Sequence, residues 1–246
     1  MPPVVYEIAD GRDVTPVWVN ELGGMTFQIG GVGDLRAEFV KTATPPWFSH
    51  LTGEEVRLSW ARRHVVVPEV LGAGDGWLHT AGLPGRSAVD PWWLARPCDA
   101  ARAIGSGLRS LHDALPVDDC PFDWSVPARL AQLPARRRTE LGDAPPVDRL
   151  VVCHGDACAP NTLIDDDGTC SGHVDLGDLG VADRWADLAV TTLSLGWNYG
   201  PGPWKSELLD AYGVAEDAVR IAYYRALWEA GDISSRARAS GATGDN

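Results

Sequence analysis

The feature that most constrains the fold of this 246-residue chain is the segment VVCHGDACAPNTLIDDDGTCSGHVDLGDLG, at residues 151–180. Asp156 precedes Asn161 by five residues in its first loop, and the triplet Asp175-Leu176-Gly177 lies near its end. Between them, the dipeptide Asp167-Gly168 separates two short apolar runs, which predicts a β-hairpin. Any fold of this chain has to accommodate a polar loop, a hairpin and a second acidic loop in that order.

The side chains of the two loops have the spacing of a kinase catalytic loop, and phosphoryl transfer explains each residue type. Because this reaction spreads negative charge over oxygens, it needs Mg²⁺, which takes oxygen ligands such as the Asn161 amide and the Asp175 carboxylate. Asp156 is then expected to accept the proton of an acceptor hydroxyl or to orient that hydroxyl. We expect Gly177 to let the backbone bend so that Asp175 faces the metal. His154 is expected to hold the loop.

A kinase of this kind also needs a strand lysine that binds the nucleotide phosphates and a helix glutamate that holds the lysine. Lys41 lies on a predicted strand, and Glu54 is expected to open the next helix, with Glu55 as a less favoured alternative. The only other lysine is Lys205, and all remaining basic residues apart from histidine are arginine. Since an ordinary surface position in this chain would favour arginine, Lys41 is a candidate functional residue.

Gly23 and Gly24, followed by Met25 and Thr26, form a weaker candidate for a turn over the phosphates. Backbone N–H groups and the Thr26 hydroxyl could bind phosphate oxygens there. Glycine pairs also mark simple hairpin turns, so this alternative stays open.

Composition narrows the classes of partner. A formal charge of -13 disfavours nucleic acid and anionic membranes and favours a cationic ligand, although acidity also serves solubility alone. We find no secretory signal and no apolar run long enough for a membrane helix. An odd number of cysteines without a C-x-x-C pair supports neither a disulfide scaffold nor a zinc site. These observations predict a soluble protein of the cytoplasm; the cysteines are Cys98, Cys120, Cys153, Cys158 and Cys170.

The pattern along the chain predicts two lobes of an α+β fold. Short β-prone runs from Val17 to Ala43, one helix and further strands indicate an N-terminal antiparallel sheet. After the punctuation LPGR, alanine-rich patterning indicates helices. We therefore predict a nucleotide-binding lobe at residues 1–82, a helical lobe with the catalytic loop and substrate site at 83–233, and a disordered tail at 234–246.

With these residues in place, the chain resembles the aminoglycoside O-phosphotransferases, antibiotic-resistance kinases that share the protein-kinase fold. The resemblance covers most of the chain and looks closest to the 3'-phosphotransferases and their 3''-streptomycin relatives. It is carried by the segments FVKT, GEEVRLSW, LRSLHDALPVDDCPFDW, VVCHGDACAPN and HVDLGDLGVADRWADLA.

This resemblance implies ATP or GTP between two lobes, with its base near Ala81 to Leu83. It also implies Mg²⁺ on Asn161 and Asp175, and Asp156 as the base. In the family, the residues that match Asp183 and Asp187 mainly brace the catalytic segment.

Three departures from the family pattern bear on the substrate. Asp178 stands where relatives commonly carry arginine, and the segment 123–150 is shorter than theirs. Near the C-terminus, Glu229 is the remaining candidate for binding a drug amine, while Trp228 could stack on a sugar or pack in the core. A kinase of another hydroxylated metabolite or amino sugar therefore stays an alternative. A catalytically inactive nucleotide-binding pseudokinase is disfavoured because all five kinase residues are intact: Lys41, Glu54, Asp156, Asn161 and Asp175.

Overall fold

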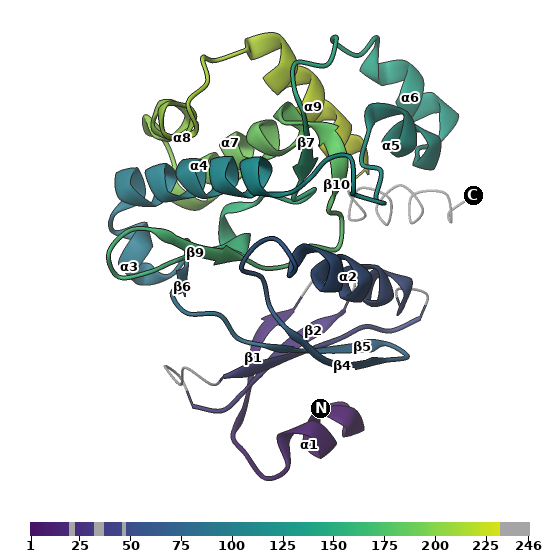
Figure 1. Cartoon of the computed structure of the whole chain (residues 1–246), viewed down its shortest axis with the longest axis vertical. Coiled ribbons are helices and arrows are strands. Elements are labelled where there is room, and N and C mark those ends of the chain that lie inside the picture. Colours follow the sequence, from purple (N-terminus) through teal and green to yellow (C-terminus); the bar gives the residue numbers. More distant parts are fainter. Residues whose placement is uncertain (20–22, 32–36, 46–47, 232–246) are drawn as a thin grey trace, which may run out of the picture.

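The structure of the protein is a computed structural model that describes residues 1–19, 23–31, 37–45 and 48–231. The chain forms two lobes, a small sheet lobe below and a larger, mainly helical lobe above (Figure 1). This arrangement confirms the predicted two-lobed α+β fold. The division of the chain between residues 82 and 83 stays a prediction, and the predicted tail at 234–246 lies outside the described residues.

The N-terminal lobe is one antiparallel sheet of five strands in the order β1-β2-β3-β5-β4. The described part of this lobe also includes the helices α1 and α2, and α2 lies between the sheet and the helical lobe (Figure 1). The elements are α1 (Pro3–Ala9), β1 (Val14–Val19), β2 (Met25–Ile29), β3 (Glu38–Thr42), α2 (Phe48–Ala61), β4 (Val70–Gly74) and β5 (Trp77–Ala81).

Side chains alternate between the two faces of this sheet, because successive residues of a strand point in opposite directions. Phe27, Ile29 and Val40 form a small core with Val5 and Ala9 of helix α1. The sequence pattern did not predict α1, and β1 begins at Val14 rather than at Val17. The opposite face of the sheet, which includes Lys41, lies toward α2 and the helical lobe.

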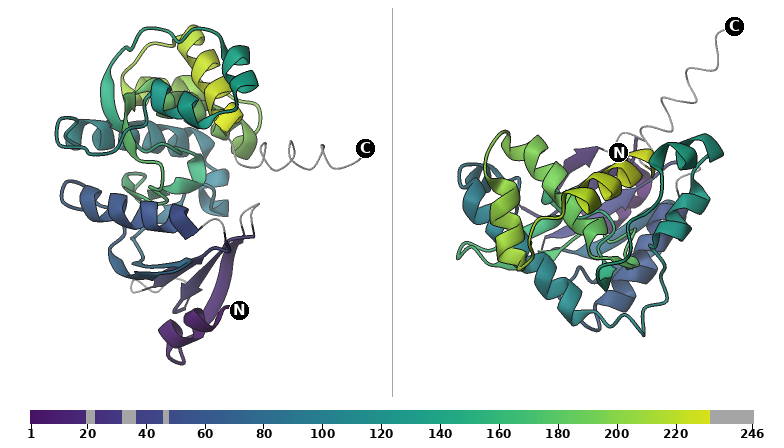
Figure 2. Two further views of the ribbon diagram at one scale, coloured as in Figure 1. Left: turned by 90° about the vertical axis from the view of Figure 1, so that its right-hand side faces the viewer. Right: turned by 90° about the horizontal axis from the view of Figure 1, so that it is seen from above.

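The second lobe buries the main core, to which nearly all of its helices contribute. It contains β6 (Arg86–Ser87), α3 (Pro91–Leu94), α4 (Pro97–Ala114), α5 (Val126–Gln132), α6 (Ala135–Leu141), β7 (Leu150–Cys153), the 3-10 helix η1 (Ala159–Asn161), β8 (Thr162–Ile164), β9 (Cys170–His173), β10 (Gly180–Asp183), α7 (Trp185–Tyr199), α8 (Trp204–Tyr212) and α9 (Ala218–Gly231). Figure 2 shows from two further sides how these helices surround the strands that carry the loops.

Two small sheets in this lobe hold the loops identified from the sequence. The predicted hairpin is present as β8 and β9, which pair antiparallel, and Gly168 in its turn has a φ of 86°. Strand β7 pairs antiparallel with β10, a pairing that the pattern did not predict. Helices α5 and α6 were also missed, because each is short and begins in a proline-rich stretch. Among the described residues, none of the helices has the length and apolar character needed to span a membrane.

Candidate active site

The loop that carries Asp156 leaves strand β7 through a tight turn at Gly155. Gly155 has a φ of 90°, and a Cβ on it would lie 2.2 Å from the backbone oxygen of Asp178. Only glycine therefore fits at this position. The loop that contains Asp178 thus lies directly against the loop that carries Asp156.

His154 holds the loop, as expected from the sequence. It is fully buried, and its Nε2 lies 2.9 Å from the carbonyl oxygen of Val174. The ring therefore donates to the segment that leads into Asp175, since a carbonyl oxygen can only accept.

Asp156 is fixed by its own loop. Asn161 Nδ2 donates to its backbone oxygen at 2.9 Å and to its Oδ2 at 3.2 Å. Burial raises the pKa of the Asp156 carboxyl above its usual range, and the nearby charge of Asp175 raises it further. A carboxylate with a raised pKa is a better proton acceptor, which suits the role of a base.

Asn161 and Asp175 come together because the backbone N–H of Val174 donates to the Asn161 carbonyl at 3.0 Å. Asp175 itself has a φ of 65°, a left-handed conformation that costs energy in any residue with a Cβ and that clusters at functional sites. The expectation that Gly177 supplies this bend was wrong. The positive φ belongs to Asp175, and a Cβ on Gly177 would make only an ordinary 3.8 Å contact with Glu54.

Lys41 connects the two lobes at this point. Its Nζ lies 2.7 Å from Oε1 of Glu54 and 2.8 Å from Oδ1 of Asp175. Burial lowers the pKa of Lys41, but the two carboxylates outweigh burial and raise it, so the amine stays charged. Glu54 is the partner that the sequence favoured over Glu55, and its side chain is only 5% exposed. It lies in the middle of α2 rather than at its start, because the helix already begins at Phe48.

The other predicted nucleotide-binding residues lie on the sheet and in the connection to the second lobe. Thr26 on β2 is paired in register with Lys41 on β3, so their side chains share the sheet face toward the helical lobe. Ala81 ends β5 and Leu83 lies in the connection to the second lobe, close to Gly172 of β9. Gly23 has a φ of 78°, as a turn requires, whereas the preceding residues 20–22 lie outside the described residues.

The predicted substrate residue Glu229 is exposed on helix α9, one turn beyond Arg225, with which it interacts electrostatically. The structure does not place it among the residues around Asp156. Trp228 contacts Trp197 of α7, with ring centroids 5.7 Å apart. The two tryptophans lie on neighbouring helices. The sequence did not predict that Trp228 would pack against another aromatic ring.

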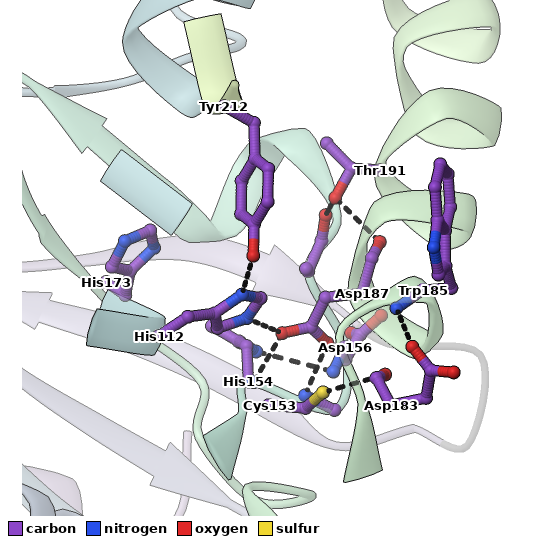
Figure 3. Close-up of polar contacts among 12 residues, drawn as sticks. His112, Cys153, His154, Asp156, His173, Asp183, Trp185, Asp187, Thr191 and Tyr212 are labelled. Atoms are coloured by element: carbon purple, nitrogen blue, oxygen red, sulfur yellow. Dashed lines mark hydrogen bonds and ion pairs between the residues drawn. The ribbon is translucent and has the colours of Figure 1, made fainter. Parts of the chain in front are cut away.

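A buried network that the sequence only partly predicted braces the loop from behind (Figure 3). Asp187 on α7 accepts hydrogen bonds from the backbone N–H groups of His154, at 2.6 Å, and Gly155, at 2.9 Å. His112 Nε2 lies 2.9 Å from the same carboxylate, and its Nδ1 lies 2.9 Å from the hydroxyl of Tyr212 on α8. Asp187 was expected to brace the loop, whereas His112 and Tyr212 were missed. The sequence feature that could have indicated this network is His112 itself, a histidine on the apolar face of the predicted helix in LRSLHDAL.

The second bracing residue, Asp183, caps the start of α7. Its Oδ1 accepts from the backbone N–H of Trp185 at 3.1 Å, and its Oδ2 accepts from that of Asp148 at 2.8 Å. Both ring nitrogens of His112 and both oxygens of Asp187 are already hydrogen bonded. The close approach of these two residues to Cys153 is therefore part of the brace and not a metal site.

A two-lobed α+β fold, with a lysine–glutamate pair in the small lobe and acidic loops in the helical lobe facing it, defines a kinase-like phosphotransferase. The profile of the phosphotransferase enzyme family matches residues 25–228. The chain belongs to this family.

Within this family, the chain is similar in sequence and structure to aminoglycoside phosphotransferases. An aminoglycoside 3'-phosphotransferase of Streptomyces fradiae is 37% identical, over 86% of this chain and 93% of the relative. The crystal structure of a type VIII aminoglycoside-3'-phosphotransferase has a TM-score of 0.77 and 32% identity, covering 89% of this chain and 94% of its own. A structure of APH(3'')-Id from Streptomyces rimosus, in complex with ADP and streptomycin, has a TM-score of 0.70 and 25% identity, covering 94% and 100%.

Proposed function

We propose that the protein transfers the γ-phosphate of ATP or GTP to a hydroxyl of an aminoglycoside and so confers resistance to that drug. The observation that carries this proposal is the convergence of Lys41 and Asp175, held 2.8 Å apart, on the loop of Asp156 and Asn161. The relatives support the acceptor class, because two that are 37% and 32% identical to this chain are named aminoglycoside 3'-phosphotransferases. The neighbour bound to ADP supports a nucleotide donor.

Lys41 would bind the phosphates of the nucleotide donor, together with Thr26, which lies beside it on the same face of the sheet. Lys41 would exchange its contact with Asp175 for the phosphates of the nucleotide, while Glu54 keeps the amine in place. We assign Ala81 and Leu83 to the nucleotide base, since both lie where the sheet lobe continues into the helical lobe.

Asn161 and Asp175 fit a magnesium site by the chemistry of their donor atoms, an amide oxygen and a carboxylate beside one another. Asn161 uses its Nδ2 to hold Asp156, which leaves its amide oxygen as the ligand atom. When bound, Mg²⁺ would neutralise charge on the phosphate oxygens. Asp156 orients the acceptor hydroxyl toward the γ-phosphorus and accepts its proton as the new P–O bond forms.

Charge favours a cationic acceptor. Asp178 lies against the catalytic loop at Gly155 and interacts electrostatically with Asp156, so two carboxylates flank the position of the acceptor. The formal charge of -13 attracts the same class of molecule over a longer range. Glu229 stays a proposed contact for an amine at the rim. A cytoplasmic location also stays a prediction, and all five cysteines are free thiols, none of them in a disulfide.

The test is nucleotide consumption with Mg²⁺ and a panel of aminoglycosides, amino sugars and other hydroxylated antibiotics. We expect turnover with one or more aminoglycosides, and a loss of at least about a thousandfold in Asp156→Ala. Asp167→Ala, which removes an exposed acid in the hairpin turn, is the matched control and should keep full activity. Turnover only with acceptors other than aminoglycosides would refute the proposed substrate, and an active Asp156→Ala would refute the mechanism.

A further inference from the structure

The side chain of Cys158 contacts the proposed base directly. Its Sγ lies 3.1 Å from Oδ1 of Asp156, and its backbone N–H donates to the Asp156 carbonyl oxygen at 2.8 Å. The other carboxylate oxygen, Oδ2, accepts from Asn161 Nδ2. Asp156 therefore has a donor on each oxygen, one from a thiol and one from an amide.

This thiol is built to stay a donor. Burial raises the pKa of Cys158 well above its usual range, and the neighbouring charge of Asp156 raises it further. A thiol in these surroundings keeps its proton at neutral pH and is a poor nucleophile. It can therefore give its hydrogen to the carboxylate, which when ionised has only acceptor positions to offer.

The segment that carries the thiol is held in turn by helix α7. The backbone N–H of Ala159 donates to Ser194 Oγ at 2.9 Å, and Thr191 Oγ1 donates to the carbonyl oxygen of Ala157 at 2.8 Å. Asn198, one turn further along α7, donates hydrogen bonds from its Nδ2 to the carbonyl oxygen and to Oγ of Ser194. Both backbone neighbours of Cys158 are thus held in place, so its Cα–Cβ bond starts from a fixed position within reach of Asp156.

We propose that Cys158 is a positioning residue, whose S–H group and the Asn161 amide together hold the Asp156 carboxylate in the one rotation that aims a free lone pair at the acceptor hydroxyl. This inference rests on the proposed function of Asp156. It goes beyond that function because it assigns to a cysteine, a residue type without a role in phosphoryl transfer, a share of the catalytic rate. The contact also explains why the site carries a thiol without using it as a nucleophile.

A kinetic test separates positioning from binding. We expect Cys158→Ala to lower kcat by about three- to tenfold, the effect of losing one hydrogen bond from a weak thiol donor, with the KM of the nucleotide unchanged. Cys158→Ser keeps a donor and should restore most of the rate. Cys98→Ala, which removes a thiol at the start of α4, is the matched control. Unchanged kcat in Cys158→Ala, or an equal loss in the serine variant, would overturn the proposal.

Infrared spectroscopy of the full chain tests the contact without any acceptor. Cys120, Cys153 and Cys170 donate to carbonyl oxygens over longer distances, between 3.4 Å and 3.7 Å. The shorter bond to a carboxylate lowers the S–H stretching frequency more, so the Cys158 thiol should absorb below the other four. We expect this band to vanish in Cys158→Ala, to move to higher frequency in Asp156→Ala, and to stay in Cys98→Ala. Absence of a lowered band refutes the contact even if the wild-type protein phosphorylates no member of the panel, so the two proposals fail independently.

Discussion

At the scale of single residues, Asp178 adds a further carboxylate near the proposed base. It follows the strained Asp175 by three positions, and its backbone and Cβ are so near Gly155 that the two loops leave no room for a side chain there. Burial raises the pKa of the Asp178 carboxyl and the charge of Asp156 raises it further, while His50 and Arg129 offset only part of this rise. A positively charged group placed between these two carboxylates would relieve that repulsion.

Asp178→Asn tests this assignment at nearly constant size. We expect the KM of the aminoglycoside to rise about tenfold, because a charge-assisted hydrogen bond to an ammonium group is lost. The KM of the nucleotide should stay the same. Asp166→Asn, at the exposed turn of the hairpin, serves as the control in steady-state kinetics. Equal acceptor KM values for Asp178→Asn and the wild type would contradict the role.

At the scale of elements, two glycines in helices have opposite surroundings. A Cβ on Gly105 of α4 would lie 2.3 Å from the backbone oxygen of Leu208, so this glycine lets α4 and α8 approach closely. A Cβ on Gly196 of α7 would meet nothing within 4 Å, and this residue is exposed. Gly105 is therefore needed for the close packing of α4 against α8. Gly196 makes no such contact, and it only lowers the stability of its helix.

These surroundings predict opposite effects of the same substitution. Gly105→Ala should destabilise the protein by about 2 kcal/mol or more, because the backbone of α8 has to move. Gly196→Ala should stabilise it by about 0.5–1 kcal/mol through helix propensity. Urea unfolding followed by circular dichroism measures both values. A stabilised Gly105→Ala would show that α4 and α8 do not make this close contact.

At the scale of the whole molecule, a buried histidine couples the hairpin, helix α4 and the catalytic loop. Nε2 of His173 on β9 lies 3.7 Å from Cys170 Sγ, and the ring interacts with the backbone of Gly107 on α4. The ring also contacts that of His154, with centroids 5.8 Å apart. Burial, together with the nearby His154, lowers the pKa of His173 to about 3. The unfolded chain would titrate there at about 6.5.

This difference predicts that acid destabilises the fold. Below about pH 6.5 the unfolded chain binds a proton that the native protein refuses, so the stabilising contribution is complete above that pH and lost toward pH 3. Between pH 6.5 and 4.5 the loss amounts to about 2 kcal/mol. Unfolding free energies measured across this range should change less steeply in His173→Gln. The exposed His64→Gln is the control and should follow the wild type.

What the sequence by itself determined is the chemistry that depends on residue type and local spacing. Asp156 and Asn161 are five residues apart on one loop, and turn residues and alternation predicted the hairpin that follows. Lys41 could be recognised because lysine is rare in this chain. The preference for Glu54 over Glu55 also held, since only Glu54 contacts Lys41.

Only the tertiary structure decided how distant side chains meet. Lys41 and Asp175 are separated by 134 positions, and their contact exists because two lobes pack around one site. The same holds for His112 and Tyr212, whose helices must be packed before either can brace Asp187. Strain at Asp175, rather than freedom at Gly177, depends likewise on backbone angles that neighbouring segments impose. The sequence specifies the type of each residue and its local spacing. Contacts between distant residues form only when the helices and strands of the whole chain pack together.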